Sequence, residues 1–510
     1  MDDDGPAYSR QRAREGRLPV STKFYQAIGG LPDAIKTWAF NIFLLLYYSQ
    51  ILGLPASWVS GVLTLSVLID AITDPLVGSY SDSLKTKWGR RHPLMYAAIL
   101  PLGLCLYCVF APPAGLSELA LLAWLALFAV GTRVAMTFYL IPWTAMFAEL
   151  SERYEERSAI LVWRYLVGGV GTLIFSVLVL RLLFPSNEAF PQGQLNPAGY
   201  PAFAIIISVT AMIAAFLTTF LTHREVPYLL QPTGSQVFGL RRTVGDLADA
   251  LRNSDFLLLF AGLLLSAFLT GTLAALEIYL NTYFWGFTSE DLSIFAIAGL
   301  GGVLAFILVP RLQRHFDKKH LLIAMMALSI SNGIIIIGLR FTGLLPANGE
   351  PLLLAILVVN EVFRLCVTMI IVVMFISMVA DTLDAQELKT GKRQEGVFSA
   401  AIAFSNKAIS GFGILVAGLL LEGFIRLPRA AGGAVSAADV PSDVIFRLVL
   451  SVIFLSLLYS IPLWLVRNYK ISRAHHHQIR AELDKRRYGL PSVRHPDPES
   501  RLPRPSEQRK

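Results

Sequence analysis

Charged residues are scarce in this sequence of 510 residues: they make up 16% of it, whereas hydrophobic residues make up 54%. Because soluble globular proteins carry about a quarter charged residues, this composition argues against an ordinary soluble domain. Apolar runs long enough to cross a hydrocarbon core of ~30 Å, which takes roughly 20 helical residues, recur along the chain. The sequence therefore predicts an all-α membrane protein. We expect twelve transmembrane helices, at residues 34–54, 57–82, 93–113, 119–148, 158–184, 200–222, 255–284, 290–310, 319–341, 350–382, 394–422 and 443–467.

Cysteine and the common catalytic motifs are lacking as well. The three cysteines, Cys105, Cys108 and Cys366, all fall inside predicted helices. Cys105 and Cys108 are one helical turn apart in an apolar run, which favours small core residues over a redox or metal site. No Walker A, dinucleotide-binding, H-E-x-x-H or G-x-S-x-G pattern occurs in a plausible context. We therefore expect no enzyme activity, no catalytic residues and no bound cofactor.

Lysine and arginine gather in the loops of one predicted face. They precede the first helix and follow the second, eighth and tenth, whereas the opposite loops "GLPAS" and "NTYFWGFTSED" are uncharged or acidic. By the positive-inside rule, both termini lie in the cytoplasm, with the helices in the inner or plasma membrane. The polar N-terminus resembles no cleavable signal, so we expect the first helix to act as the insertion signal.

The C-terminal tail, residues 468–510, is basic and contains several prolines. We expect it to be disordered and solvated, held at the anionic inner leaflet. Binding of nucleic acid is the other interpretation of a basic tail, and we do not expect it.

The twelve predicted helices divide into two sets of six. We place a cytoplasmic N-terminal segment at 1–32, a first six-helix bundle at 33–222, a polar central loop at 223–254, a second bundle at 255–467, and the tail after it. The second part of the central loop is predicted to form an amphipathic surface helix. The loops after the second and eighth helices are both short and basic, which indicates an internal repeat. Such repeats are typical of secondary transporters with a site between the two halves.

Two carboxylates, Asp70 and Asp74, lie inside the apolar stretch "LIDAITDPLVG". Residues four apart share one face of a helix, so both side chains point the same way. Unpaired acids are costly in a membrane, and therefore we expect them to face a cavity and to have a partner. Three partners fit: a hard cation such as Na⁺, a shared proton, or a fixed basic side chain such as Lys407 or Arg164.

The segment from Gly78 to Arg91 carries a motif. Gly78-x3-Asp82 followed by Gly89-Arg90-Arg91 resembles the loop motif of the major facilitator superfamily. The longer string "DAITDPLVGSYSDSLKTKWGRRHP" resembles the glycoside–pentoside–hexuronide:cation symporter family of that superfamily, as do residues 141–165 and 380–407. The resemblance implies a major facilitator fold and symport of a sugar or glycoside with Na⁺ or H⁺ by alternating access.

The resemblance also assigns residues to a site. It implies cation binding by Asp70, Asp74 and Thr137, with no other metal. Two of the family's sugar-contacting acids are missing, because Leu140 and Ala34 occupy their positions. As substrate contacts, from the resemblance and from the need for polar groups and aromatic platforms, we expect Asp33, Arg164, Lys407, Tyr139 and Trp143.

Other ionisable residues have local explanations. Asp33 could instead pair with Lys36. Glu361 and Arg364, three residues apart, are expected to form an internal ion pair. Glu277 and Arg133 also fall in predicted spans, without a motif.

The Gly78–Arg91 motif has a mechanical interpretation. Gly78 would permit close helix approach, Asp82 would cap a neighbouring helix, and Arg90 and Arg91 would bridge to acids of the other half such as Asp381 or Glu395. Contacts of this kind would bias alternating access.

Two other functions remain open. A lysophospholipid or other amphipathic solute could replace the sugar, since two sugar acids are missing. A non-transporting sensor or scaffold has no distinguishing motif. We expect the partners to be a small solute and the lipid bilayer, and the protein to be a monomer.

Overall fold

The computed structural model describes residues 8–9, 16–151, 153–229, 231–232, 254–390, 407, 409, 411–428, 439–469, 471 and 473–488. The predicted surface helix of the central loop lies largely outside these ranges. Described helices fill both halves of the chain, and a two-residue antiparallel pair joins β1 (Tyr8–Ser9) to β2 (Gln231–Pro232).

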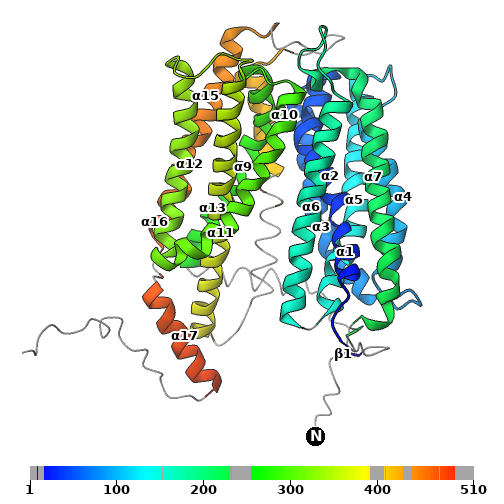
Figure 1. Cartoon of the computed structure of the whole chain (residues 1–510), viewed down its shortest axis with the longest axis vertical. Coiled ribbons are helices and arrows are strands. Elements are labelled where there is room, and N and C mark those ends of the chain that lie inside the picture. The colour runs from blue at the N-terminus through cyan, green and yellow to red at the C-terminus, as the bar shows by residue number, and fades with distance from the viewer. Residues whose placement is uncertain are drawn as a thin grey trace, which may run out of the picture.

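The first half is a bundle of long apolar helices (Figure 1). α4 packs against α5 and α7, α3 packs against α5, and α1 packs against α6 and α7. The predicted N-terminal segment therefore contributes a helix, α1, to the packing of this bundle. The elements are α1 (Val20–Ile28), α2 (Leu31–Ala39), η1 (Phe40–Leu44), η2 (Tyr47–Ile51), α3 (Ala56–Ser83), α4 (His92–Phe110), α5 (Glu118–Leu150), α6 (Tyr154–Leu182), η3 (Gly193–Leu195), η4 (Pro197–Gly199), α7 (Tyr200–Thr222) and η5 (His223–Tyr228).

The second half is a bundle of similar construction, centred on the long helix α13. α13 packs against α9, α11 and α12, and α9 also packs against α15 and α16. The elements are α9 (Ser254–Tyr279), η6 (Leu280–Phe284), α10 (Ser289–Phe295), η7 (Ala296–Gly299), α11 (Leu300–His315), α12 (Lys318–Phe341), α13 (Pro351–Thr390), η8 (Leu420–Ile425), α15 (Ser442–Leu458), α16 (Ser460–Arg467) and α17 (Arg473–Tyr488).

Local sequence explains where several of these helices begin. The Ser117 side chain accepts a hydrogen bond from the Ala120 backbone ahead of α5, and Thr288 forms a capping box with Asp291 at the start of α10. Such caps satisfy backbone N–H groups that have no partner within the helix. Gly89 has φ of +75°, a conformation that favours glycine, in the turn before α4.

The predicted spans agree with the described helices. Ten helices in the described residues are long and apolar enough to cross a membrane. The first predicted span corresponds to the continuous helical segment formed by α2, η1 and η2, whose later part is π-helical. The eleventh corresponds to the shorter apolar helix Gly411–Ile425, and much of its predicted first part lies outside the described residues. The predicted fold class, an all-α membrane protein of the major facilitator type, is confirmed.

The two halves are joined by hydrogen bonds at one end of the molecule. Ser49 and Tyr279 share a bond of 2.9 Å between their hydroxyl groups, and Ser186 N donates to Glu290 Oε1 over 2.9 Å. The Ser57 hydroxyl likewise donates to Glu422. In Figure 1, α10 approaches α6 at this upper end, whereas β1 and α17 lie at the lower end. Contact between the halves is thus concentrated at the end opposite to α17.

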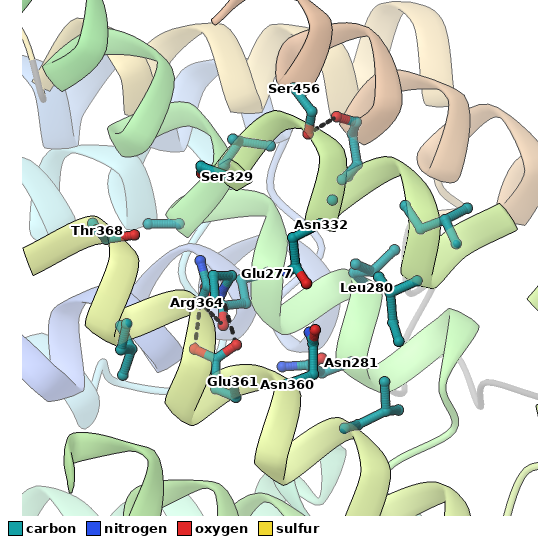
Figure 2. A pocket seen from close by; sticks show the side chains of 18 of the residues that line it. Glu277, Leu280, Asn281, Ser329, Asn332, Asn360, Glu361, Arg364, Thr368 and Ser456 are labelled. Atoms are coloured by element: carbon teal, nitrogen blue, oxygen red, sulfur yellow. Dashed lines mark hydrogen bonds and ion pairs between the residues drawn. The ribbon is translucent and has the colours of Figure 1, made fainter. Parts of the chain in front are cut away.

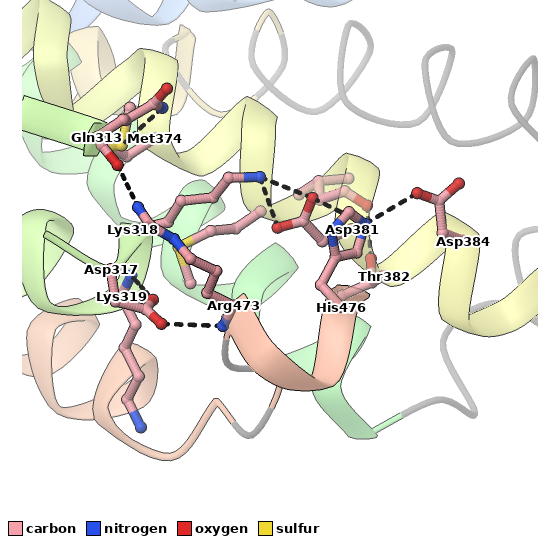
Figure 3. A network of polar contacts seen from close by, with 12 residues as sticks. Gln313, Asp317, Lys318, Lys319, Met374, Asp381, Thr382, Asp384, Arg473 and His476 are labelled. Atoms are coloured by element: carbon pink, nitrogen blue, oxygen red, sulfur yellow. Dashed lines mark hydrogen bonds and ion pairs between the residues drawn. The ribbon is translucent and has the colours of Figure 1, made fainter. Parts of the chain in front are cut away.

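The region predicted to be a disordered tail contains a helix, α17, and that prediction is wrong for residues 473–488. Figure 3 shows α17 against the lower ends of α11, α12 and α13. His476 Nε2 lies 3.0 Å from Asp384 Oδ2, and Arg480 Nε lies 2.9 Å from the same atom. Arg473 N donates to Asp317 Oδ2 over 3.0 Å. These bonds fix the helix because they pair its basic side with the acids of α13 and with the start of α12.

Candidate functional site

A cavity of about 530 Å³ lies between the two halves. Its wall combines α2, η1, α3 and α5 of the first half with α9, α12 and α13 of the second. The polar and ionisable residues that line it are Asp33, Lys36, Thr37, Asn41, Asp70, Asp74, Arg133, Thr137, Ser266, Thr270, Ser329, Thr368, Lys407 and Tyr459.

The predicted cation-binding residues come together on the wall of this cavity. Thr137 Oγ1 lies within hydrogen-bond distance of both carboxylates, 2.8 Å from Asp70 Oδ1 and 3.1 Å from Asp74 Oδ1, and its single proton can be donated to either. The two carboxylates lie on one face of α3, as their spacing predicts, and Thr137 reaches them from α5. The side chain of Asp70 is 11% exposed and that of Asp74 is 20% exposed. Three oxygen ligands of the kind that a hard cation prefers therefore converge here.

A lysine from the second half occupies the same site. Lys407 Nζ contacts Asp74 Oδ2 and lies 3.1 Å from Asp70 Oδ2. Arg133, which the sequence left unassigned, lies 3.8 Å from Asp70 Oδ2 and donates from Nε to Ser66 Oγ over 2.8 Å. In this conformation the two aspartates are therefore compensated by fixed cations of the protein.

Asp33 also lines the cavity, next to its neighbour Lys36. The Lys36 ammonium lies 2.8 Å from the Asp33 carboxylate. Three carboxylates and three cations thus face the same cavity, and their charges cancel. The carboxylates are Asp33, Asp70 and Asp74, and the cations are Lys36, Arg133 and Lys407.

The structure does not place the other predicted substrate contacts in this cavity. Tyr139 is fully buried and donates to the Gly29 carbonyl over 3.2 Å, and Trp143 donates from Nε1 to the Gln26 carbonyl over 2.8 Å. Arg164 stacks on the Trp143 ring, its Cζ 3.5 Å from the ring centroid. These three residues join α5 and α6 to the start of the chain, and among the described residues they are not part of the cavity wall. The reason is helical geometry, because a residue two positions after Thr137 lies about 200° around α5.

The Gly78–Arg91 motif forms a cluster within the first half. Arg91 Nη2 lies 2.5 Å from Asp82 Oδ1 and 2.7 Å from Glu149 Oε1, and Arg90 Nη2 lies 2.8 Å from the same Glu149 oxygen. Sequence reasoning missed Glu149. A Cβ atom added at Gly78 would lie 3.6 Å from Ile141, an ordinary contact, so this conformation does not depend on glycine there.

The expected bridge from Arg90 and Arg91 to Asp381 is not what the structure shows. Asp381 is paired within its own half, where Lys318 Nζ lies 2.7 Å from Oδ2 and His476 Nε2 lies 3.4 Å from Oδ1. Figure 3 shows this pairing at the lower end of α13. The other proposed partner, Glu395, lies outside the described residues. Asp82 contacts the side chains of the two arginines that directly precede the neighbouring helix α4.

Sequence reasoning also left residues of the second half without a role. Glu361 and Arg364 do form the predicted pair, with 2.7 Å between Arg364 Nε and Glu361 Oε2, but Arg364 also binds Glu277 over 2.7 Å. These residues line a further pocket. A sequence pattern could have found these residues. Polar residues spaced by four inside apolar helices, such as Arg133 with Thr137 and Asn360 with Arg364, share one helical face and so indicate a polar pocket wall.

Two bundles of membrane-spanning helices around a shared polar cavity are typical of secondary transporters. A family model described as "MFS/sugar transport protein" matches residues 25–473, and the chain belongs to this family. It is a multi-pass integral membrane protein and a transporter, not an enzyme.

Curated relatives are distant but cover most of the chain. The isoprimeverose transporter of Lactiplantibacillus pentosus is 22% identical over 83% of this chain and 85% of its own length. The putative glycoside/cation symporter YagG of Escherichia coli is 22% identical over 88% of this chain and 92% of its own length. The lactose permease of Leuconostoc lactis is 24% identical over 94% of this chain and 73% of its own length.

Solved structures support the fold alone. The nucleoside transporter NupG gives a TM-score of 0.57 at 12% identity, covering 88% of this chain and 99% of its own. The xylose transporter XylE of E. coli, in a partially occluded inward-open conformation, gives a TM-score of 0.54 at 15% identity. The match covers 89% of this chain and 98% of XylE.

Proposed function

We propose that the protein is a symporter of the inner or plasma membrane that couples entry of Na⁺ or H⁺ to uptake of a sugar or glycoside. The observation that carries the proposal is the meeting of Asp70, Asp74, Thr137 and Lys407 on the wall of a cavity between the halves. The names of the relatives, which include sugar transporters and a glycoside/cation symporter, support the solute class.

The coupling ion would act by displacing Lys407. A cation held by the two carboxylates and the Thr137 hydroxyl would take over the charge compensation that the lysine ammonium provides here. The released ammonium, which is a hydrogen-bond donor only, would then be free to bind an oxygen of the solute. Ion and solute would in this way favour one another's binding, which is the requirement for symport.

The concentration of contacts between the halves at one end supports alternating access. Bonds such as Ser49–Tyr279 and Ser186–Glu290 would close that end in this conformation and break in the other. With the basic loops in the cytoplasm, as the positive-inside rule requires, the closed end is the one that faces away from the cytoplasm.

The experiment is uptake by proteoliposomes with an imposed Na⁺ or pH gradient. Asp74→Asn should abolish gradient-driven uptake while leaving insertion and monodispersity unchanged, because a neutral amide cannot hold the cation. Asp443→Asn is the matched control, since its side chain is 68% exposed at the start of α15, outside the cavity. Gradient-driven uptake that survives in Asp74→Asn would refute the ion site. Binding of a lysophospholipid in place of any sugar would refute the solute class.

A further inference from the structure

A second pocket, of about 290 Å³, lies within the second half, and we call it the C-half pocket (Figure 2). It is formed by α9, η6, α12, α13 and α15. Five residues line both this pocket and the central cavity, so the two adjoin: Thr270, Ala274, Ser329, Thr368 and Tyr459. A solute in the central cavity therefore lies directly beside the C-half pocket.

An ion triad with an excess of negative charge lines this pocket. Arg364 binds Glu361 through two nitrogens, at 2.7 and 2.5 Å, and binds Glu277 over 2.7 Å. One guanidinium thus serves two carboxylates, whose oxygens retain the capacity to accept further hydrogen bonds. The side chains of Glu277 and Arg364 are 33% and 36% exposed, although both lie in membrane-spanning helices that form the pocket wall.

Three side-chain amides, from Asn281, Asn332 and Asn360, line the same pocket. The amide groups of Asn281, Asn332 and Asn360 form no hydrogen bond to another residue in the described part of the chain. All three are partly buried, and they come from three different elements, η6, α12 and α13. Because these amides line an open pocket and bond to no residue in the described part of the chain, their N–H and C=O groups are available to a solute that enters it.

Helical spacing brings these groups to one side. Asn360, Arg364 and Thr368 repeat every four residues on α13, and Glu277 and Asn281 do so across α9 and η6. Figure 2 shows Asn332 facing this set from α12. Trp285, Phe287 and Phe295 complete the wall with apolar surface. An apolar wall with a few convergent polar groups is the usual composition of a small-molecule site.

A purely structural role explains only part of this arrangement. The Arg364 ion pairs link α9 to α13, and such links hold helices together in a membrane. The three amides add nothing to that link, because none of them bonds to the triad in the described part of the chain.

The chemistry of the pocket favours hydroxyl groups over an amine. An ammonium donates only, so it would use the carboxylates and leave the amide N–H groups unpaired. A hydroxyl both donates and accepts, so it can donate to Glu277 or Glu361 and accept from an asparagine. A sugar ring offers several such hydroxyls together with apolar C–H faces.

We propose that the C-half pocket is a solute subsite that binds the hydroxyl-rich outer ring of a glycoside with at least two rings, while the inner ring lies in the central cavity near Asp70 and Asp74. The proposal rests on the proposed symport of a sugar or glycoside. It makes Asn332 and Asn360 specificity-determining residues that act on the second ring alone.

The test compares disaccharides with matched single rings on the purified full-length protein in detergent, with Na⁺ present, at two pH values. The probes are lactose, isoprimeverose, melibiose, maltose and cellobiose, each beside the methyl glycosides of its two component rings, and one lysophospholipid. Binding is measured by titration calorimetry and by thermal shift. The variants are Asn332→Ala and Asn360→Ala, which remove no bond within the described protein. Asn468→Ala is the matched control, because this exposed amide donates to the Trp464 carbonyl near the end of α16 and, in the described part of the chain, lies outside the pocket.

The expected result is a disaccharide that binds the wild type more tightly than its single rings do. Asn332→Ala and Asn360→Ala should each weaken that disaccharide about tenfold, as expected for the loss of one or two hydrogen bonds. Each should leave the single rings, the Na⁺ response and the apparent Tm of the free protein unchanged. Having two variants on different helices protects the test against a folding defect in either one.

Other outcomes overturn the proposal in distinguishable ways. A disaccharide whose affinity is unchanged in both variants, or single rings that bind as well as any disaccharide, would refute the subsite and leave sugar symport intact. Binding of the lysophospholipid alone, or of no probe, would refute the proposed solute class and the subsite with it.

Discussion

Replacement of Lys407 by glutamine should tighten the binding of Na⁺. The Lys407 ammonium contacts Asp74 and lies 3.1 Å from Asp70 Oδ2, in the position that a coupling cation would compete for. Unit charges ~4 Å apart interact by about 4 kcal/mol at an effective dielectric constant of ~20. The lysine side chain is 38% exposed, so solvent screens the pair and the net effect is smaller. We expect about 1.4 kcal/mol, or a tenfold gain in Na⁺ affinity.

The assay is the apparent Tm of the purified protein as a function of Na⁺ concentration. Lys407→Gln should unfold earlier than the wild type without Na⁺, because removal of one partner leaves buried carboxylates uncompensated. The difference should shrink as Na⁺ saturates, with half-saturation at about one tenth of the wild-type concentration. Lys485→Gln is the control, since Lys485 pairs with Glu482 on α17, outside the cavity. A Na⁺ response in Lys407→Gln that is equal to or weaker than that of the wild type would show that lysine and cation do not compete.

Three further substitutions separate the roles of individual groups. Thr137→Val removes an oxygen ligand that Na⁺ needs and a proton does not. Na⁺-driven uptake should weaken about tenfold, for a loss of about 1.5 kcal/mol, and H⁺-driven uptake should be unchanged. Equal losses with both ions would contradict this. Asp384→Asn removes the acid beside His476, and limited proteolysis should then cut within 473–488 several-fold faster while uptake persists; an unchanged digest would show that the pair does not hold α17. Trp143→Phe removes the donor to the Gln26 carbonyl, so it should lower the free energy of unfolding by about 1 kcal/mol and leave solute affinity within about twofold of the wild type. A large loss of affinity would show that Trp143 contacts the solute.

Ion pairs in the cavity link the two halves of the protein. Asp70 and Asp74 belong to the first half, and Lys407 belongs to the second. The ion pairs between them therefore join the halves near the site, besides the hydrogen bonds at the closed end. A cation that displaces the lysine would weaken this connection, and the solute would restore it with its own contacts. Ion and solute together would then permit the change of conformation that neither permits alone.

The sequence by itself determined the features that depend on short spacing. Apolar runs of about 20 residues must form spanning helices, because no other single-segment structure satisfies the backbone in lipid. Asp70 and Asp74 share a face because they are four residues apart, and Glu361 pairs with Arg364 because they are three apart. The same spacing rule explains why Arg133, left without a role in the sequence analysis, lines the cavity with Thr137.

Only the tertiary structure decided which faces meet. Lys407 reaches Asp70 across 337 positions of sequence, and no local pattern specifies such a contact. Trp143 lies on the face of α5 that packs on the start of the chain, whereas Thr137 lies on the face that lines the cavity. A helix in a membrane is apolar on most sides, so its sequence gives little indication of which side packs against protein and which faces lipid. Packing of neighbouring helices decides this, and here it placed the proposed cation ligands, and not the aromatic rings of α5, in the cavity.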